Sequence, residues 1–344
     1  MTQQTTDAAA RPTVTTMRAA VARRFGGPDV VAVERVTKPE PKPGEVLVRL
    51  HASTVSIADH RVRSKDLPAG LGFLAVVALG VFRPRMPILG MEGAGVIEAV
   101  GSEVTAFSPG DRVIVLRGSA MGCHAEYVTV AADRSIARIP ADVSFEDAAA
   151  LVFGGYTALS FLAQVDLGPG VEVLVNGASG AVGTAVVQLA AAAGARVTAV
   201  CSAANAELVR SLGADRVIDY AREDFAAGGD RYDVVVECVG NAPFRRVRGI
   251  LNPGGALLMV IADLRSMLSE RWHSRRSGLL VTHTGTVFGG AVMRNLVARA
   301  AAGEIRPVID RTYDLAEIVE AHRYVDTGRK RGSVVVRIAA EGAR

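Results

Sequence analysis

The chain has 344 residues, of which 49% are hydrophobic, 22% charged and 5% aromatic, and its formal net charge at pH 7 is +4. This length predicts two domains, and the hydrophobic content is typical of a well-packed globular protein rather than a disordered chain. The mild positive charge is scattered and has few aromatic side chains around it, so we expect no nucleic-acid partner.

Residues 1–16 contain no basic segment followed by an apolar core, so they do not look like a signal peptide, and we expect a disordered extension. The longest apolar stretch, Leu71–Phe82, is about half the length that crosses a bilayer, and we expect no transmembrane segment. Cys123, Cys201 and Cys238 are too far apart for a disulfide framework or paired zinc ligands. A reducing, cytoplasmic location is therefore expected.

From Met17 to about Asp142 the sequence predicts a β-rich domain. Gly, Pro and Asp turns separate the strand-length runs MRAAVARRF, VVAVERV, EVLVRLHASTV, GAGVIEAVG, DRVIVL and AEYVTV. A helix follows, for which Ser144 is the expected N-cap, because Glu146 and Asp147 stand in its first turn.

Between residues 146 and 288 strands alternate with helices, beginning with the buried-type strand Val171–Val175. This alternation predicts a doubly wound parallel sheet. A helix (AVMRNLVARAAAGEI) and a final strand (GSVVVRI) follow. The expected fold is therefore α/β: a β-rich domain formed by residues 17–145 and 289–344, with a dinucleotide-binding domain, residues 146–288, inserted into it.

The sharpest motif is NGASGAVG, residues 176–183, which connects a hydrophobic strand to an Ala-rich helix. Small residues let the backbone approach a pyrophosphate, and the helix N-terminus supplies free N–H groups and the positive end of the helix dipole. Strand, turn, helix and next strand occur in the order that such a site needs. The predicted cofactor-binding residues here are Gly177, Ala178, Gly180, Ala181, Val182 and Gly183.

The end of the second strand predicts which nicotinamide cofactor binds. NAD sites normally carry an acidic residue there, but the place falls at Cys201, and the next carboxylate, Glu207, is already in the following helix. Without that carboxylate a 2′-phosphate is not repelled, and Ser202 and Asn205 could donate hydrogen bonds to it. We therefore expect NADPH rather than NADH. The basic partner of the phosphate stays open between Arg210 and Lys330.

In this order of elements the sequence resembles the medium-chain dehydrogenase/reductase superfamily from Met17 to Ile338, and NGASGAVG resembles its quinone-oxidoreductase-like branch. The likeness also rests on GEVLVRLHAS, PILGMEGAGVIEAVGSEVTAFSPGDRV, SLGADRVIDY, DVVVECVG and LNPGGALLMV. It implies a GroES-like catalytic domain, a Rossmann cofactor domain, a cleft between them and hydride transfer from a nicotinamide. Further cofactor contacts are expected at Thr157, Tyr220, Val239, Gly240, Val260 and Phe288.

The resemblance also bears on zinc. Zinc-dependent members have a His-Glu pair where this chain has Met91-Glu92, and cysteine ligands at Ser56 and near Phe153. Serine and phenylalanine cannot complete a tetrahedral zinc site, and three cysteines cannot form the four-cysteine structural lobe. We expect no zinc, and expect Ser56, Met91 and Phe153 to line a substrate pocket.

Without a Lewis acid, reduction of an activated C=C bond is favoured over reduction of a carbonyl. Hydride would go to the β-carbon of an enone or quinone, and the enolate would then be protonated. The expected substrate is a small hydrophobic enone, quinone or carbonyl compound. Two alternatives stay open: an alcohol or aldehyde oxidoreductase, and a nucleotide-binding protein with a scaffolding or sensing role.

His60 and Tyr156 are the candidate catalytic residues. His60 lies where this superfamily lines its cleft and could donate a proton to a substrate oxygen; a helix-capping or surface histidine is the alternative. Tyr156 follows a Gly-Gly pair in the interdomain helix, and core packing is its alternative. Asp59 and Arg63 are expected to form a structural i,i+4 ion pair. Leu67 stands where enoyl-thioester reductases of the superfamily have a tyrosine, which counts against that activity.

Three further segments are left without a single interpretation. Leu71–Phe82 is either a wall for a hydrophobic substrate or a helix packed on its domain. Arg265–Leu280 carries the only tryptophan, Trp272, and borders the cleft, a membrane or a subunit interface. The last predicted Rossmann strand, LLVTHTGTV, leaves an edge that pairs across a two-fold dimer in this superfamily, so we expect a homodimer.

Overall fold

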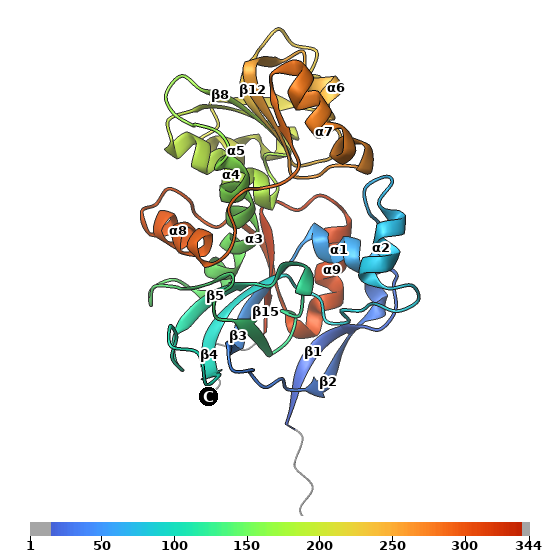
Figure 1. Ribbon diagram of the computed structural model, residues 1–344, viewed down its shortest axis with the longest axis vertical. Helices are drawn as coiled ribbons and strands as arrows, with labels where there is room; N and C mark the ends of the chain where they lie inside the picture. The colour runs from blue at the N-terminus through green and yellow to red at the C-terminus, as the bar shows by residue number, and fades with distance from the viewer. Residues whose placement is uncertain (1–14, 339–344) are drawn as a thin grey trace, which may run out of the picture.

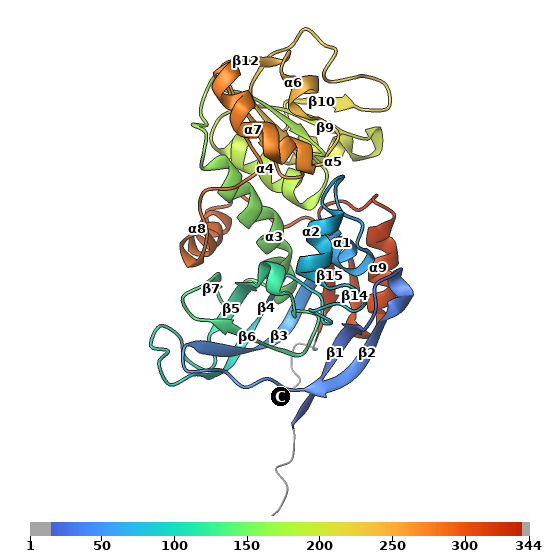
Figure 2. The same cartoon turned by 45° about the vertical axis from the view of Figure 1, so that its right-hand side comes forward.

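The computed structural model of the protein describes residues 15–338, without the side chains of residues 73–75. Two domains lie one above the other, and a long helix runs between them (Figures 1 and 2). Residues 1–14, which make up most of the predicted extension, lie outside the described part of the chain. The expected α/β class, with one β-rich and one doubly wound domain, is confirmed.

The lower domain is built on a seven-stranded sheet of order β14-β15-β3-β4-β5-β7, with β6 paired to β3. Except for β14 and β15, which are parallel, neighbouring strands pair antiparallel. Its strands are β3 (Glu45–Val55), β4 (Glu92–Val100), β5 (Arg112–Leu116), β6 (Tyr127–Ala131), β7 (Ile136–Arg138), β14 (Ile309–Asp314) and β15 (Ser333–Arg337). A separate antiparallel pair, β1 (Thr16–Ala22) and β2 (Val31–Thr37), lies beside it.

Several helices of the described residues belong to this domain. They are α1 (Ile57–Ser64) and α2 (Gly72–Leu79), which follow β3 along the chain, α8 (Gly290–Ala301), which contacts β7, and α9 (Ile318–Asp326), which contacts α1 and β15. Valines and leucines of β3, β5 and β15 and Ile97 of β4 form the core together with Ile318 and Val325 of α9. Within residues 15–338 no helix combines the length and apolarity needed to cross a membrane.

The upper domain is a six-stranded parallel sheet of order β10-β9-β8-β11-β12-β13, so the strand order reverses between β8 and β11. Ligands of doubly wound sheets bind at the carboxyl ends of the strands beside this reversal. The strands are β8 (Glu172–Asn176), β9 (Arg196–Cys201), β10 (Arg216–Asp219), β11 (Tyr232–Glu237), β12 (Leu251–Met259) and β13 (Leu280–Thr282). The helices between them are α4 (Ala181–Ala192), α5 (Ala206–Ser211), α6 (Phe244–Val247) and α7 (Leu264–Ser277).

The connecting helix is α3 (Phe145–Leu162), and it is buried on most of its surface. Ser144 caps it as predicted, because its hydroxyl accepts a 3.0 Å hydrogen bond from the Asp147 amide. The helix contacts β3, β4 and β15 of the lower domain and also α4 and α8 (Gly290–Ala301). It therefore fixes the position of the cofactor sheet relative to the β-rich domain.

The last strand of the parallel sheet is shorter than predicted. β13 ends at Thr282, whose hydroxyl bonds the amide and carbonyl of Thr284 in a local turn. The carboxylate of Glu270 on α7 then accepts hydrogen bonds from the His283 amide and ring. These side-chain hydrogen bonds take the place of the β-ladder hydrogen bonds that the apolar sequence LLVTHTGTV predicts.

Candidate functional site

The turn between β8 and α4 brings a helix N-terminus against the edge of the sheet. Gly177 has a φ of 81°, a left-handed conformation that favours glycine. A Cβ on Gly183 would lie 2.2 Å from the Gly177 carbonyl oxygen, so only glycine lets the helix start this close to the turn. Gly180, the N-cap, has no side chain to cap the helix. The first N–H groups of α4, from Ala181 to Gly183, therefore remain available to an anion.

Two other segments border this turn. The amide of Gly332 donates a 2.8 Å hydrogen bond to the Ser179 carbonyl, which attaches the loop before β15 to the turn. Asn205, just before α5, donates a 3.0 Å hydrogen bond to the Ser179 hydroxyl. Lys330 of the same loop donates through Nζ to the Gly332 carbonyl at 2.5 Å. The predicted residue Asn205 and the loop that carries the candidate Lys330 thus both adjoin the turn at Ser179.

Burial sets the charge state of Lys330. Desolvation of its amino group lowers the pKa to about 8, while the carboxylates of Glu92 and Asp310 favour the protonated form. The residue as a whole is half-buried, so its stem reaches inward and its charge lies out of bulk water. A cation held there is well placed to meet a phosphate, and a bound phosphate would in turn favour its protonated form.

A buried carboxylate organises the other side of the turn. Glu237, at the end of β11, accepts hydrogen bonds from the amides of Val239 at 2.5 Å and Gly240 at 2.6 Å. It also accepts a 2.8 Å bond from the side chain of Asn176 at the end of β8. The sequence predicted Val239 and Gly240 but missed Glu237 and Asn176. The sequence did contain a signal for Glu237: the apolar run VVVE ends in a carboxylate. A carboxylate buried at that position needs a hydrogen-bond partner.

The remaining predicted cofactor residues lie around the carboxyl edge of the sheet or on α3. Three of them are large apolar side chains left exposed, namely Tyr220, Val239 and Phe288. A Cβ on Gly177 would lie 2.8 Å from Val239, so this valine adjoins the turn. Exposed apolar side chains beside a polar turn are typical of a ligand surface. Partly exposed residues complete the set: Thr157 on α3, Ser202 after β9 and Val260 after β12.

On the lower domain, Ser56 and Met91 are joined through Asp59. Ser56 caps α1: its hydroxyl accepts from the Ala58 amide and donates to Asp59 Oδ2 at 2.8 Å. Asp59 Oδ1 accepts a 2.8 Å hydrogen bond from the Gly90 amide, next to Met91. Gly90 has a φ of 90°, and a Cβ there would lie 2.6 Å from the His124 ring. The predicted substrate-pocket residue Ser56 therefore already serves as a helix cap.

The ion pair expected between Asp59 and Arg63 is wrong. Asp59 bonds Ser56 and Gly90, whereas Arg63 binds both carboxylate oxygens of Asp326, at 2.7 and 2.6 Å. The carboxylate of Asp59 is already bonded within the capping box at the start of α1, so it is not available to Arg63. Arg63 is fully buried, and a carboxylate from α9 is the partner that reaches it.

The two candidate catalytic residues both make structural hydrogen bonds. His60 Nδ1 lies 2.8 Å from Asp326 and its Nε2 lies 3.3 Å from Asp66. The Tyr156 hydroxyl accepts a 2.8 Å bond from the Gly289 amide and so anchors the start of α8. The ring of His60 is partly exposed, whereas Tyr156 is almost entirely buried. His60 is therefore the better placed of the two to meet a substrate.

Glu92 is a buried carboxylic acid next to Met91. The Thr54 hydroxyl donates to its Oε1, while Oε2 has no partner among the described residues. Burial, assisted by the nearby charge of Asp59, raises the pKa of Glu92 to about 8, although Thr54 and Lys330 oppose the shift. Burial thus favours the neutral acid form of Glu92.

Comparison with known proteins identifies the family. A family model described as "Alcohol dehydrogenase GroES-like domain" matches residues 42–141, and one described as "Zinc-binding dehydrogenase" matches residues 212–336. The chain is 31% identical over 343 residues to "Quinone-oxidoreductase QR1, chloroplastic" of Triphysaria versicolor, covering 93% of this chain and 98% of that one. The chain belongs to the quinone-oxidoreductase-like branch of the medium-chain dehydrogenase/reductase superfamily. As a member of that branch it is an oxidoreductase with a pyridine-nucleotide-binding fold.

Two further similarities extend over nearly the whole of this quinone-oxidoreductase-like chain. The "NADPH-dependent alkenal/one oxidoreductase, chloroplastic" of Arabidopsis thaliana is 29% identical over 336 residues, covering 93% of this chain and 79% of that one. The solved quinone oxidoreductase from Coxiella burnetii superposes with a TM-score of 0.83 at 26% identity, covering 94% of this chain and all of that one. The GroES-like and Rossmann domains that the sequence predicts are thereby confirmed.

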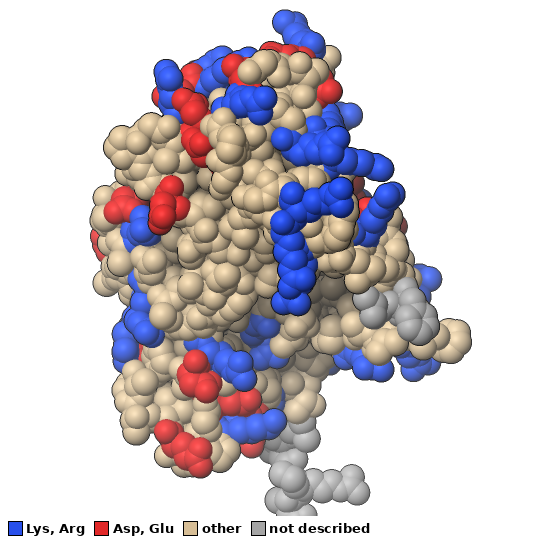
Figure 3. Space-filling view, turned by 45° about the horizontal axis from the view of Figure 1, so that its top comes forward, with Lys and Arg blue, Asp and Glu red and all other residues tan. Residues whose placement is uncertain are grey.

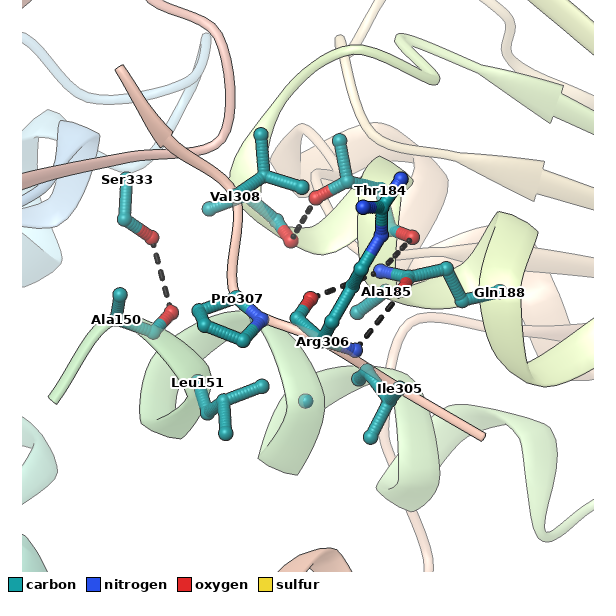
Figure 4. Close-up of a pocket in the computed structure, with 13 residues that line it drawn as sticks. Ala150, Leu151, Thr184, Ala185, Gln188, Ile305, Arg306, Pro307, Val308 and Ser333 are labelled. Carbon is teal, nitrogen blue, oxygen red and sulfur yellow. Dashed lines mark hydrogen bonds between the residues drawn. The ribbon is translucent and has the colours of Figure 1, made fainter. Parts of the chain in front are cut away.

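A small pocket of this quinone-oxidoreductase-like protein lies between α3, the first turns of α4 and the segment 305–308 (Figure 4). The faces of α3 and α4 that pack together form its walls, and the segment 305–308 closes it. Gln188 of α4 exchanges two hydrogen bonds with the backbone of Arg306, at 3.1 and 2.9 Å. These bonds hold the C-terminal segment of the catalytic domain onto the cofactor domain. We therefore interpret the pocket as space left between packed elements rather than as a ligand site.

The protonation of Glu92 gives a testable pH dependence. Its folded pKa of about 8 lies above the ordinary 4.5, so the stability that the protonated acid contributes is present below pH 4.5 and lost as the pH rises to about 8. Glutamine cannot ionise. We expect Glu92→Gln to match the parent's free energy of unfolding to within about 1 kcal/mol near pH ~5 and to exceed it near pH ~8 by about 3 kcal/mol, or about 6–12 °C in Tm. Thermal unfolding at both pH values tests this, and a pH-independent difference would contradict it.

Proposed function

We propose that this enzyme uses NADPH to reduce the activated C=C bond of a quinone or enone, without zinc. The observation that carries the proposal is the uncapped N-terminus of α4 beside a β9 that ends in Cys201 rather than in a carboxylate. Support comes from two relatives, whose names specify a quinone in one case and NADPH with an alkenal or enone in the other.

The surroundings of Cys201 favour a 2′-phosphate. Asp219 is the nearest carboxylate, but it accepts a bond from the Ala221 amide in its own turn and lies 3.7 Å from Arg222. Burial, with Asp219, raises the pKa of the Cys201 thiol to about 11, whereas the nearby Arg210 guanidinium acts in the opposite direction. Arg210 is exposed and close to the end of β9, so we propose it, with Ser202 and Asn205, as a ligand of the phosphate.

The donor set does not fit zinc, although one matching family description mentions it. The superfamily's ligand places hold Ser56, Met91 and Phe153, and the Ser56 hydroxyl already donates to Asp59. In the described part of the chain no group of three or more His, Cys, Asp or Glu side chains is arranged to hold a metal ion. No step of the proposed reaction passes through a metal.

When bound, NADPH would supply the hydride that the β-carbon of the substrate receives. The N–H groups at the start of α4 and the amine of Lys330 would hold the cofactor phosphates, and Glu237 fixes the loop 238–240 beside them. Ser56, Met91 and Phe153 are proposed to line the substrate pocket. The substrate enolate then takes a proton at its α-carbon from water or from His60, whose ring the carboxylates of Asp326 and Asp66 orient.

Two parts of the proposal concern the protein as a whole. We propose a homodimer formed at the free edge of β13, which pairs only with β12 in the described sheet. We also propose a cytoplasmic location, in which Cys123, Cys201 and Cys238 remain free thiols. Sedimentation velocity over a concentration series tests the dimer, and a single monomeric species at every concentration would contradict it.

Oxidation of NADPH with a panel of quinones, enones and aldehydes, in the presence and absence of a chelator, tests the proposed function. We expect turnover with quinones or enones that the chelator leaves unchanged. Activity restricted to alcohols and aldehydes, or lost with the chelator, would favour a metal-dependent alcohol dehydrogenase. Tight NADPH binding with no turnover on any acceptor would favour a sensing or scaffolding role.

Arg210 provides a specific test of the cofactor preference. Arg210→Ala removes a charged partner of the 2′-phosphate, and a charged hydrogen bond contributes about 1.5–3 kcal/mol. We expect the KM for NADPH to rise about 10-fold or more, with the KM for NADH almost unchanged. Arg196→Ala, at the opposite end of β9, is the matched control. A KM for NADPH that changes no more than in this control would remove Arg210 from the site.

A further inference from the structure

The outward face of α7 combines arginines with two large apolar side chains. Its exposed residues recur three or four apart, which places them on one side of the helix. Leu268 is 76% exposed and Trp272 is 57% exposed. Four arginines surround them on the same face: Arg265, Arg271, Arg275 and Arg276. Tryptophan and leucine flanked by basic residues are typical of a helix that lies in a membrane interface.

The helix α2 continues this face onto the catalytic domain. Its sequence, GFLAVVAL, contains no polar side chain, and Val76 and Val77 are exposed. The chain leaves it through Val81 and Phe82, and Phe82 is 87% exposed. The Leu264 amide, at the start of α7, donates a 3.1 Å hydrogen bond to the Ala69 carbonyl just before α2. Figures 1 and 2 both show α7 above α2 on the same side of the molecule.

We call these residues the α2–α7 surface: Val76, Val77, Val81, Phe82, Leu268 and Trp272, with Arg265, Arg271, Arg275 and Arg276. Asp263, the N-cap of α7, interacts electrostatically with Arg265. In the described part of the chain none of the four arginines forms an ion pair or a side-chain hydrogen bond. The one carboxylate of α7, Glu270, faces inward and bonds the His283 ring at 2.5 Å. Lys and Arg side chains gather on the right-hand half of the face in Figure 3, with few Asp or Glu among them.

We propose that the α2–α7 surface docks onto a lipid bilayer that contains anionic phospholipid. The arginines would meet the headgroup phosphates, while Phe82, Leu268 and Trp272 would enter the boundary of the acyl chains. The exposed aliphatic side chains that interrupt the arginines distinguish this surface from a nucleic-acid site. Such a site needs a continuous basic stripe with aromatic side chains on which bases stack. The docking does not depend on the proposed reaction, but it would bring the domain boundary to the place where a lipophilic quinone dissolves.

The only tryptophan of the chain is the probe. With the full-length protein we expect vesicles of phosphatidylcholine and phosphatidylglycerol to shift the Trp272 emission to shorter wavelength and to carry the protein upward in flotation. Vesicles of phosphatidylcholine alone should do neither, and high salt should reverse the binding to anionic vesicles. Each surface arginine changes partitioning onto an anionic membrane about 5-fold. The double variant Arg271→Gln with Arg275→Gln should therefore weaken partitioning onto the anionic vesicles about 30-fold.

Two variants separate specific docking from general attraction to charge. Arg134→Gln with Arg222→Gln removes the same charge at side chains that are exposed elsewhere, and should bind as the parent does. Phe82→Ser leaves the charge unchanged and should weaken flotation. No shift of Trp272 with anionic vesicles, or equal losses in the two arginine pairs, would overturn the proposal. A Trp272 shift that follows protein concentration without lipid would instead assign the surface to a second copy of the chain.

Discussion

Gly183→Ala is expected to lower kcat/KM for NADPH about 100-fold or more and to destabilise the protein by about 2 kcal/mol. The added Cβ would lie 2.2 Å from the Gly177 carbonyl oxygen and 2.7 Å from the Ala178 Cα. Both are backbone atoms of the turn, so the helix must move away from it, and overpacking of this kind costs about 1–3 kcal/mol. A displacement of about 1 Å at a positioning element can cost about 100-fold in rate.

Steady-state kinetics and thermal unfolding measure the two effects of Gly183→Ala separately, and calorimetric titration with NADPH shows whether the loss lies in binding. Gly249→Ala is the matched control, because a Cβ on Gly249 would meet nothing within 4 Å and its backbone is not left-handed. We expect this control to bind and unfold as the parent does. A Gly183→Ala protein that keeps parental affinity for NADPH would show that the cofactor does not bind at the N-terminus of α4.

Asp326→Ala is expected to destabilise the catalytic domain by about 3–5 kcal/mol. Arg63 is fully buried and makes two hydrogen bonds to this carboxylate, at 2.7 and 2.6 Å, with its remaining bond to the Gly26 carbonyl at 2.6 Å. Removing one partner of a buried ion pair leaves the other charge uncompensated, and the cost of that is of this size. Asp326→Ala also removes the closer of the two carboxylates that contact the ring of His60.

Asp66→Ala is the control for that substitution. Asp66 is the other carboxylate near His60, but its side chain is 78% exposed and the contact is 3.3 Å, so we expect a loss of at most about 1 kcal/mol. Urea unfolding followed by circular dichroism gives both free energies. Equal losses for the two variants would contradict the assignment of Arg63 and Asp326 as the buried pair that holds α1 to α9.

Signals local in sequence predicted the fold well. β3 covers the run EVLVRLHASTV without a residue added or lost, and Ser144 caps α3 as its neighbours indicated. The turn after β8 was recognisable because its small residues lie between a buried strand and a helix. Short strands were harder: β7 has only three residues, too few for a periodic pattern.

Contacts between distant segments could not be predicted in the same way. Arg63 finds its partner 263 residues away, whereas the i,i+4 rule could point only to Asp59. The attachment of the Gly332 loop to Ser179 also joins residues far apart in sequence, and it brings Lys330 to the turn after β8. The apolar run 71–82 showed that a hydrophobic segment exists, but only the fold shows that Phe82 is exposed to solvent.

Transfer of deuterium from NADPH labelled at C4 tests the central claim most directly. The enzyme is treated with a chelator, then given an enone and labelled NADPH, and the product is examined by NMR. We predict deuterium at the β-carbon, formed at the same rate as without the chelator. Turnover that appears only after Zn²⁺ is added back, or a product without the label at that carbon, would contradict a metal-free hydride transfer.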